Sequence, residues 1–267
     1  MRTVLALEVS VGTPAPPVVR RRSRSDGRAR RWDAGPVPTA RDLAALRFVG
    51  DQYAVRLDVA TVLLTRLSTA GPERGSQLSR RAVREQLGRW EQAGWAERRR
   101  LLGHTWVSLT RAGLRLAGLE FEVWSPALDR LDHHHAASVV RLHREPVPGR
   151  GRWVCERALW RRRGNASWHL ADAALPAPVP TSWAQQGINE AWELVEVELT
   201  QKARPRVLAA LKTRPPHTAA VSYYVPAALH AALAAQLAGV VRELGGRPPV
   251  TVQPLPTVAG TTYGGTG

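Results

Sequence analysis

Two glutamates on one expected strand, followed by a lysine, are the residues whose types and spacing could do chemistry. In residues 191–202, AWELVEVELTQK, Glu196 and Glu198 alternate with aliphatic side chains, so a strand would place both carboxylates on one face. Lys202 follows, in a chain whose only other lysine is Lys212. Mg²⁺ prefers carboxylate oxygens, activates bound water and stabilises charge on a phosphate. The pattern predicts metal-assisted hydrolysis of a phosphodiester.

A metal site of this kind needs a third carboxylate, and Asp172 in the segment SWHLADAAL is the candidate. A hairpin through PAPVPTSWAQQGIN would bring Asp172 beside Glu196 and Glu198. The expected catalytic residues are therefore Asp172, Glu196, Glu198 and Lys202, and the three acids are the expected Mg²⁺ ligands. A charged outer face is also common on half-exposed strands, so a purely solvated face explains the two glutamates equally well.

Composition indicates the class of partner. The 267 residues carry a formal net charge of +16 and a sequence pI of about 11.5. Such an excess favours binding to a polyanion, most plausibly nucleic acid, with an anionic membrane surface as the weaker alternative. No apolar run approaches the roughly 18 residues of a spanning helix, so we expect a cytoplasmic protein without a membrane partner. Cys155 is the only cysteine, which excludes an internal disulfide and a thiolate metal cluster.

The first half of the chain has the element order of a winged helix-turn-helix. We expect helices at 39–50, 56–67 and 78–95, a hairpin at 95–110 and a short helix at 110–119. In a winged helix the third helix enters the major groove and the hairpin contacts the DNA backbone. The expected DNA-binding residues are Arg80, Arg81 and Arg84 on that helix and Arg98, Arg99 and Arg100 on the wing. A small helical bundle with a solvated basic face is the alternative.

The second half alternates between strand and helix patterns. We expect a helix at 126–145, strands at 153–159, 167–175 and 191–199, a helix at 204–213, a strand at 218–225, a helix at 226–246 and a strand at 250–255. The predicted organisation is a basic disordered tail at 1–38, the winged helix-turn-helix at 39–120, an α/β domain at 121–255 and a flexible tail at 256–267.

His133, His134 and His135 diverge by about 100° per residue on a helix, so we do not expect them to share a metal ion.

The order of these segments, with HLADAAL, LVEVELTQKARPRV and VSYYVP, resembles the replication-relaxation proteins of plasmids and mobile elements over roughly residues 40–230. The resemblance implies an α+β chain, with an N-terminal winged helix-turn-helix followed by a restriction-endonuclease-like three-layer α/β domain. It also implies a role in replication and DNA relaxation, and places the acidic and lysine positions at Asp172, Glu196 or Glu198, and Lys202.

Two functions remain open on these grounds. The first is a DNA-binding protein of a mobile element that nicks double-stranded DNA with Mg²⁺. The second is a non-catalytic winged-helix regulator of transcription or replication whose nuclease-like domain is degenerate. Double-stranded DNA is the expected partner of both, and a homodimer is left open.

Overall fold

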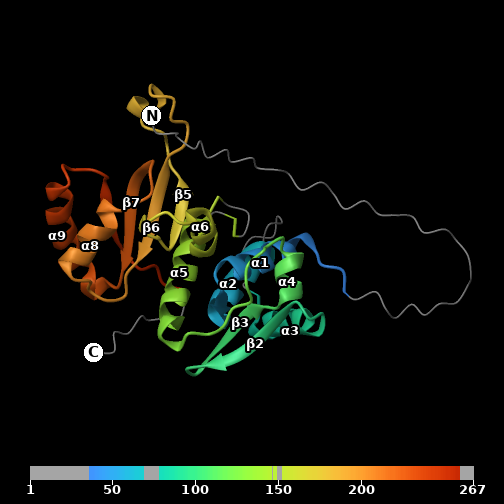
Figure 1. The fold of residues 1–267 in the computed structure, drawn as a ribbon. Helices are drawn as coiled ribbons and strands as arrows, with labels where there is room; N and C mark the ends of the chain where they lie inside the picture. The colour runs from blue at the N-terminus through green and yellow to red at the C-terminus, as the bar shows by residue number, and fades with distance from the viewer. Residues whose placement is uncertain (1–35, 69–77, 146, 149–151, 259–267) are drawn as a thin grey trace, which may run out of the picture. The chain divides into compact units, whose positions relative to one another are not determined.

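The computed structural model describes residues 36–68, 78–145, 147–148 and 152–258 (Figure 1). From Pro36 onward, the described residues belong to one compact unit. Nearly all of the expected N-terminal tail and most of the expected C-terminal tail lie outside these ranges. Within these ranges, no helix is long and apolar enough to cross a membrane.

The first half of the described chain forms the expected helices and hairpin, with one additional strand. The elements are α1 (Ala40–Asp51), β1 (Ala54–Arg56), α2 (Leu57–Ser68), α3 (Arg80–Gln92), β2 (Ala96–Leu101), β3 (His104–Leu109) and α4 (Arg111–Leu116). β1 pairs antiparallel with β3, and β3 pairs antiparallel with β2, in the order β1-β3-β2. The hairpin formed by β2 and β3 therefore gains a third strand from the segment between α1 and α2.

Side-chain caps fix where α1 and α3 begin. Thr39 accepts a hydrogen bond from the amide of Asp42, and the Asp42 carboxylate accepts one from the amide of Thr39, which is a complete capping box for α1. Ser79 accepts from the amide of Ala82 at 3.1 Å and so starts α3 at Arg80. The basic residues at the start of α3 therefore occupy its first turns.

The second half contains a five-stranded sheet with helices on both faces (Figure 1). Its elements are η1 (Leu128–Arg130), α5 (Leu131–Arg144), β4 (Val154–Cys155), α6 (Glu156–Arg163), β5 (Ala173–Pro176), α7 (Thr181–Ala184), β6 (Trp192–Val197), α8 (Arg204–Lys212), β7 (Thr218–Val225), α9 (Ala227–Glu243) and β8 (Val250–Pro254). The strand order is β4-β5-β6-β7-β8, antiparallel from β4 to β6 and parallel from β6 to β8.

The two faces of this sheet bury different residues of β6. Leu194 packs in the core that includes Val207 of α8 and Leu233 of α9. Val195 packs in the core that includes Val140 of α5. The period-two pattern of β6 is thus confirmed, and the described residues form a mixed α+β fold with two sheets. Glu196, which follows the parity of Leu194, lies on the α8 and α9 side.

The prediction of a strand at 153–159 is wrong beyond its first residues. Only Val154–Cys155 is strand, and α6 begins at Glu156. Arg157 lies on this helix with its guanidinium over the rings of Tyr53 and Phe121, at 4.6 Å and 4.5 Å. It also donates to the carbonyl of Gly50 at 2.8 Å. These distant contacts bury a residue of α6 that sequence periodicity assigned to a strand.

Two other expected elements are shorter than predicted. The strand expected at 167–175 is present only as β5, so Asp172 lies immediately before the strand. The helix expected from residue 126 begins as an α-helix at Leu131, after the 3-10 turn η1.

Candidate functional site

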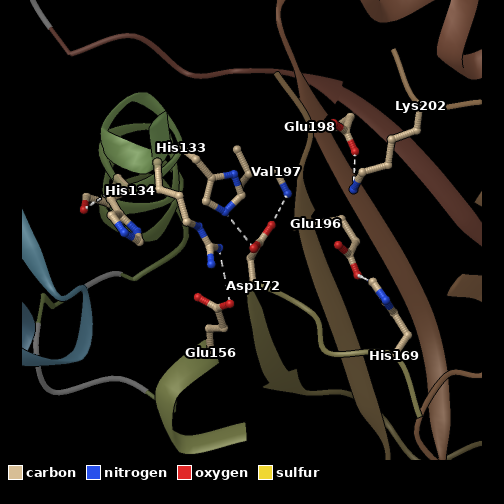
Figure 2. Close-up of polar contacts among 11 residues, drawn as sticks. His133, His134, Glu156, His169, Asp172, Glu196, Val197, Glu198 and Lys202 are labelled. Carbon is tan, nitrogen blue, oxygen red and sulfur yellow. Dashed lines mark hydrogen bonds and ion pairs between the residues drawn. The ribbon is translucent and has the colours of Figure 1, made fainter. Parts of the chain in front are cut away.

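Asp172 holds together two parts of the second half (Figure 2). Its Oδ2 accepts a hydrogen bond from the backbone amide of Val197 at 2.7 Å. The hydrogen-bonded ladder between β5 and β6 ends at the pair Ala173–Val195. Beyond that pair, the Asp172 carboxylate replaces a β5 carbonyl as the acceptor for the Val197 amide. Its Oδ1 lies 2.8 Å from Nε2 of His133 on α5. Both carboxylate oxygens of Asp172 therefore have partners within the protein.

Glu196 also meets a histidine. Its side chain is buried, and Oε1 lies 2.9 Å from Nε2 of His169 in the segment before β5. Figure 2 shows the Glu196 and Asp172 side chains directed to different partners on the two sides of Val197. The parity of β6 places Glu196 on the face covered by α8 and α9, while His133 reaches Asp172 from α5 on the other face.

Glu198 follows β6 and pairs with Lys202. Its backbone amide donates to the carbonyl of Tyr224 at 2.9 Å, which extends the contact between β6 and β7. Its carboxylate lies 2.5 Å from Nζ of Lys202. The Lys202 carbonyl in turn accepts from the side-chain amide of Gln236 on α9 at 3.0 Å. The lysine is thus held between the end of β6 and α9.

The pairing with His133 favours the ionised form of Asp172. Burial alone would raise the pKa of Asp172, but the charge and hydrogen bond of His133 and the hydrogen bond from the Val197 amide outweigh burial and lower the pKa. For His133, burial alone would lower the pKa, and the charge and hydrogen bond of Asp172 raise it instead. The two shifts favour an ionised carboxylate next to a protonated imidazole.

The pKa of Glu196 is raised, in contrast to that of Asp172. Burial raises the pKa of Glu196, and the nearby charge of Asp172 adds to this effect, while the hydrogen bond from His169 opposes it. For His169, burial alone would lower the pKa, but the hydrogen bond and charge of Glu196 raise it. Burial also opposes the charged form of Lys202, yet contact with Glu198 and the charges of Glu196 and Asp172 raise its pKa.

The four residues expected from the sequence are brought within electrostatic range of one another. Each acid nevertheless has its own basic partner: His133 for Asp172, His169 for Glu196 and Lys202 for Glu198. Among the described residues, no group of three histidine, cysteine, aspartate or glutamate side chains is placed to hold a metal ion. The assignment of the three carboxylates as Mg²⁺ ligands stays a prediction.

Sequence reasoning missed the two histidines of this cluster. His169 lies three residues before Asp172 in HLAD, and this closeness to the predicted acid is a signal in the sequence. His133 belongs to the histidine run, whose spacing gives no signal of a contact with Asp172. The three histidines do diverge as expected: His133 meets Asp172, His134 stacks on Tyr53 with ring centroids 4.7 Å apart, and His135 is buried.

The arginines expected on the recognition helix are exposed at the start of α3. Arg80, Arg81 and Arg84 all lie on its solvent side, opposite the buried Val83 and Leu87. Arg81 forms an exposed ion pair with Glu85 at 2.8 Å. Arg80 and Arg84 form no ion pair with the residues that the structure describes.

The arginines expected on the wing lie on β2. Arg98, Arg99 and Arg100 are exposed. The backbone amide of Arg98 and its guanidinium Nε donate to Glu91 of α3 at 2.9 Å and 2.7 Å, which fastens the hairpin to the helix. Arg99 pairs with Glu97 at 2.7 Å, and Arg100 has no acidic partner in the described part of the chain.

Comparison with family models, curated proteins and solved structures found no match. The winged-helix and nuclease-like assignments stay predictions from the sequence.

Proposed function

We propose that the protein binds double-stranded DNA through the first turns of α3 and the exposed face of β2, and that α1 to α4 with the hairpin form a winged helix-turn-helix. The observation that supports this most is the pair Arg80 and Arg84. The two residues are four apart on one helix, so their side chains share a face. They are exposed and have no acidic partner among the described residues.

The order of the elements supports the same surface. α3 is the third helix and is followed directly by the hairpin, as in winged-helix proteins whose third helix enters the major groove. The contact between Arg98 and Glu91 holds the wing against that helix. Exposed ion pairs such as Arg81–Glu85 contribute only about 0–1 kcal/mol, so their arginines can exchange a carboxylate for a phosphate at little cost.

The second half then acts as a scaffold in a regulator of replication or transcription of a mobile element. In this function the carboxylates of Asp172, Glu196 and Glu198 stabilise the sheet through their basic partners and take no part in DNA binding. Positive charge would still attract the duplex to the whole molecule, because the chain carries a net charge of +16.

The test measures the affinity of the full chain for a labelled DNA duplex by fluorescence anisotropy. Arg80→Ala with Arg84→Ala should weaken binding by roughly tenfold or more, since each lost contact to a base or phosphate removes a substantial part of the binding free energy. Arg206→Ala with Arg242→Ala, at exposed positions of α8 and α9, is the matched control for lost charge. Equal weakening by both pairs would reject α3 as the DNA-binding surface.

A metal-dependent DNA endonuclease is the second candidate function, with Mg²⁺ as its cofactor. One observation favours it: the pKa of Lys202 responds to Glu198, Glu196 and Asp172 together, so all four expected catalytic residues lie within electrostatic range. Incubating the protein with supercoiled plasmid in Mg²⁺ or Mn²⁺ tests this function. Cleavage that Glu198→Gln abolishes without loss of DNA affinity would establish it, and absence of cleavage in both metals would remove it.

A further inference from the structure

The exposed side of α6 carries a large aromatic side chain that no core residue covers. Trp160 is 62% exposed, the highest exposure among the large aromatic side chains that the structure describes. It is followed by Arg161, Arg162 and Arg163 at the end of the helix. An exposed tryptophan within a run of arginines has no role in the two functions proposed above.

Arg163 lies beside the ring of Trp160 and is held there by its own contacts. Its guanidinium lies 5.7 Å from the ring centroid of Trp160 and 5.9 Å from that of Trp168. Its Nε donates to the carbonyl of Ala166 at 2.7 Å, in the segment that follows the helix. Trp160 and Arg163 are three residues apart and therefore share a face of α6. The helix end and the next segment together hold the arginine beside the exposed ring.

The arginine charges in the last turn of α6 are only partly neutralised. Arg161 pairs with Glu120 at 2.9 Å. Arg162 is exposed and has no acidic partner in the ranges that the structure covers. The turn therefore presents positive charge next to an aromatic face. This combination matches the two requirements of single-stranded nucleic acid, whose unstacked bases pack on aromatic rings and whose phosphates attract arginine.

We propose that Trp160, Arg162 and Arg163 form a contact site for unpaired nucleotides of a nucleic acid strand. A base stacks on the exposed face of Trp160, while Arg162 and Arg163 contact the flanking phosphates. The proposal rests on the proposed function only for the class of partner, because the site lies on α6 and not on α3 or β2. An acidic peptide could satisfy the arginines but would not use the aromatic face in the same way.

The position of α6 places this site near Asp172. The helix begins at Glu156, whose amide donates to the carbonyl of Asp172 at 2.9 Å. Trp160 follows four residues later, about 6 Å along the helix axis. A nucleic acid strand held on Trp160 would therefore lie close to Asp172, at the start of β5.

The experiment compares the affinity of the full chain for a labelled single-stranded oligonucleotide and for a duplex. Trp160→Ala should weaken single-strand binding roughly tenfold, because stacking of one base on an aromatic side chain is worth about 1–3 kcal/mol. It should leave duplex binding nearly unchanged. Trp160→Phe, which keeps an aromatic face, should restore most of the affinity, and Arg206→Ala on α8 is the control for an exposed change elsewhere.

The outcomes separate this proposal from the binding of duplex DNA. If Arg80→Ala with Arg84→Ala weakens only duplex binding and Trp160→Ala weakens only single-strand binding, both proposals are supported. If Trp160→Ala leaves single-strand affinity unchanged, or if the protein binds duplex alone, the α6 site is rejected and duplex binding stands. Equal competition by poly-glutamate and by single-stranded DNA, each dependent on Trp160, would indicate an acidic-peptide site and would also reject the proposal.

Discussion

His133 and Asp172 are 39 positions apart in sequence, and Nε2 of the first lies 2.8 Å from Oδ1 of the second. The contact joins α5 to the start of β5. Because the other oxygen of Asp172 accepts from the amide of Val197 on β6, one carboxylate connects a covering helix with two strands. The pair therefore links α5 to the five-stranded sheet.

The first prediction concerns the pH dependence of this pair. The raised pKa of His133 makes its contribution complete below the unfolded value of about 6.5, and the contribution is lost as pH rises through the folded value. The lowered pKa of Asp172 makes its contribution complete above about 4, and it is lost as pH falls through the folded value. His133→Ala should therefore lower the free energy of unfolding by about 2 kcal/mol near pH 5.5, and by less near pH 8.5.

Urea denaturation at the two pH values measures this difference. His143→Ala is the matched control, because His143 is an exposed histidine on the same helix. A loss of stability that is the same at both pH values would show that the charged state of His133 contributes nothing.

The contribution of His134 to stability should change with pH in the opposite direction to that of His133. Burial lowers the pKa of His134 to about 4, with a further contribution from the charges of His133 and Arg130. The unfolded chain then binds a proton more readily than the folded chain between about pH 6.5 and 4, so stability is lost as pH falls through this window. His134→Phe, which keeps a ring against Tyr53, should reduce the acid-induced fall in melting temperature. An unchanged pH profile would contradict the burial of a neutral imidazole.

Local patterns were sufficient to predict α1, α2, α3, the hairpin and the alternation of β6. Each has its signal within a few residues, such as the cap by Thr39 or the apolar positions of the strand. β1 was missed because three residues carry no periodicity. It forms by pairing with β3, about fifty positions later in the chain. Long-range pairing of this kind has no local signature.

The segment 153–159, which runs from β4 into α6, shows how a correct pattern can give a wrong element. Trp153, Cys155, Arg157 and Leu159 are all buried, so the alternation that suggested a strand is real in burial. The backbone is nonetheless helical from Glu156: Tyr53 and Phe121 cover Arg157, and Leu159 packs in the core that includes Leu194. Similarly, the acids of the candidate site were visible in the sequence, whereas their histidine partners, 27 and 39 positions away, were not.

Two glycines give a matched test of the packing around α3 and α4. A Cβ added at Gly88 of α3 would meet no atom within 4 Å, whereas one added at Gly113 of α4 would lie 1.9 Å from the carbonyl oxygen of Trp95. Gly88→Ala should raise the free energy of unfolding by about 0.5–1 kcal/mol. Gly113→Ala should lower it by about 3 kcal/mol, because backbone must move. Thermal unfolding of both variants checks this, and equal effects would contradict the close approach of α4 to Trp95.

The pairing of each acid with a base predicts a weak response to Mg²⁺. Adding Mg²⁺ should change the melting temperature of the wild-type protein and of Glu198→Gln by the same small amount, because Glu198 is already neutralised by Lys202. Differential scanning fluorimetry across a Mg²⁺ titration measures both. A rise confined to the wild type would contradict the scaffold role of the cluster and favour the endonuclease.

The salt dependence of duplex binding tests the DNA-binding surface most directly. The logarithm of the affinity should fall linearly with the logarithm of salt concentration, and each lost phosphate contact should reduce the slope by about one. Arg80→Ala with Arg84→Ala should therefore reduce the slope by about two, while Arg206→Ala with Arg242→Ala should leave it nearly unchanged. Identical slopes for the wild type and the α3 variant would contradict the proposal that α3 binds DNA.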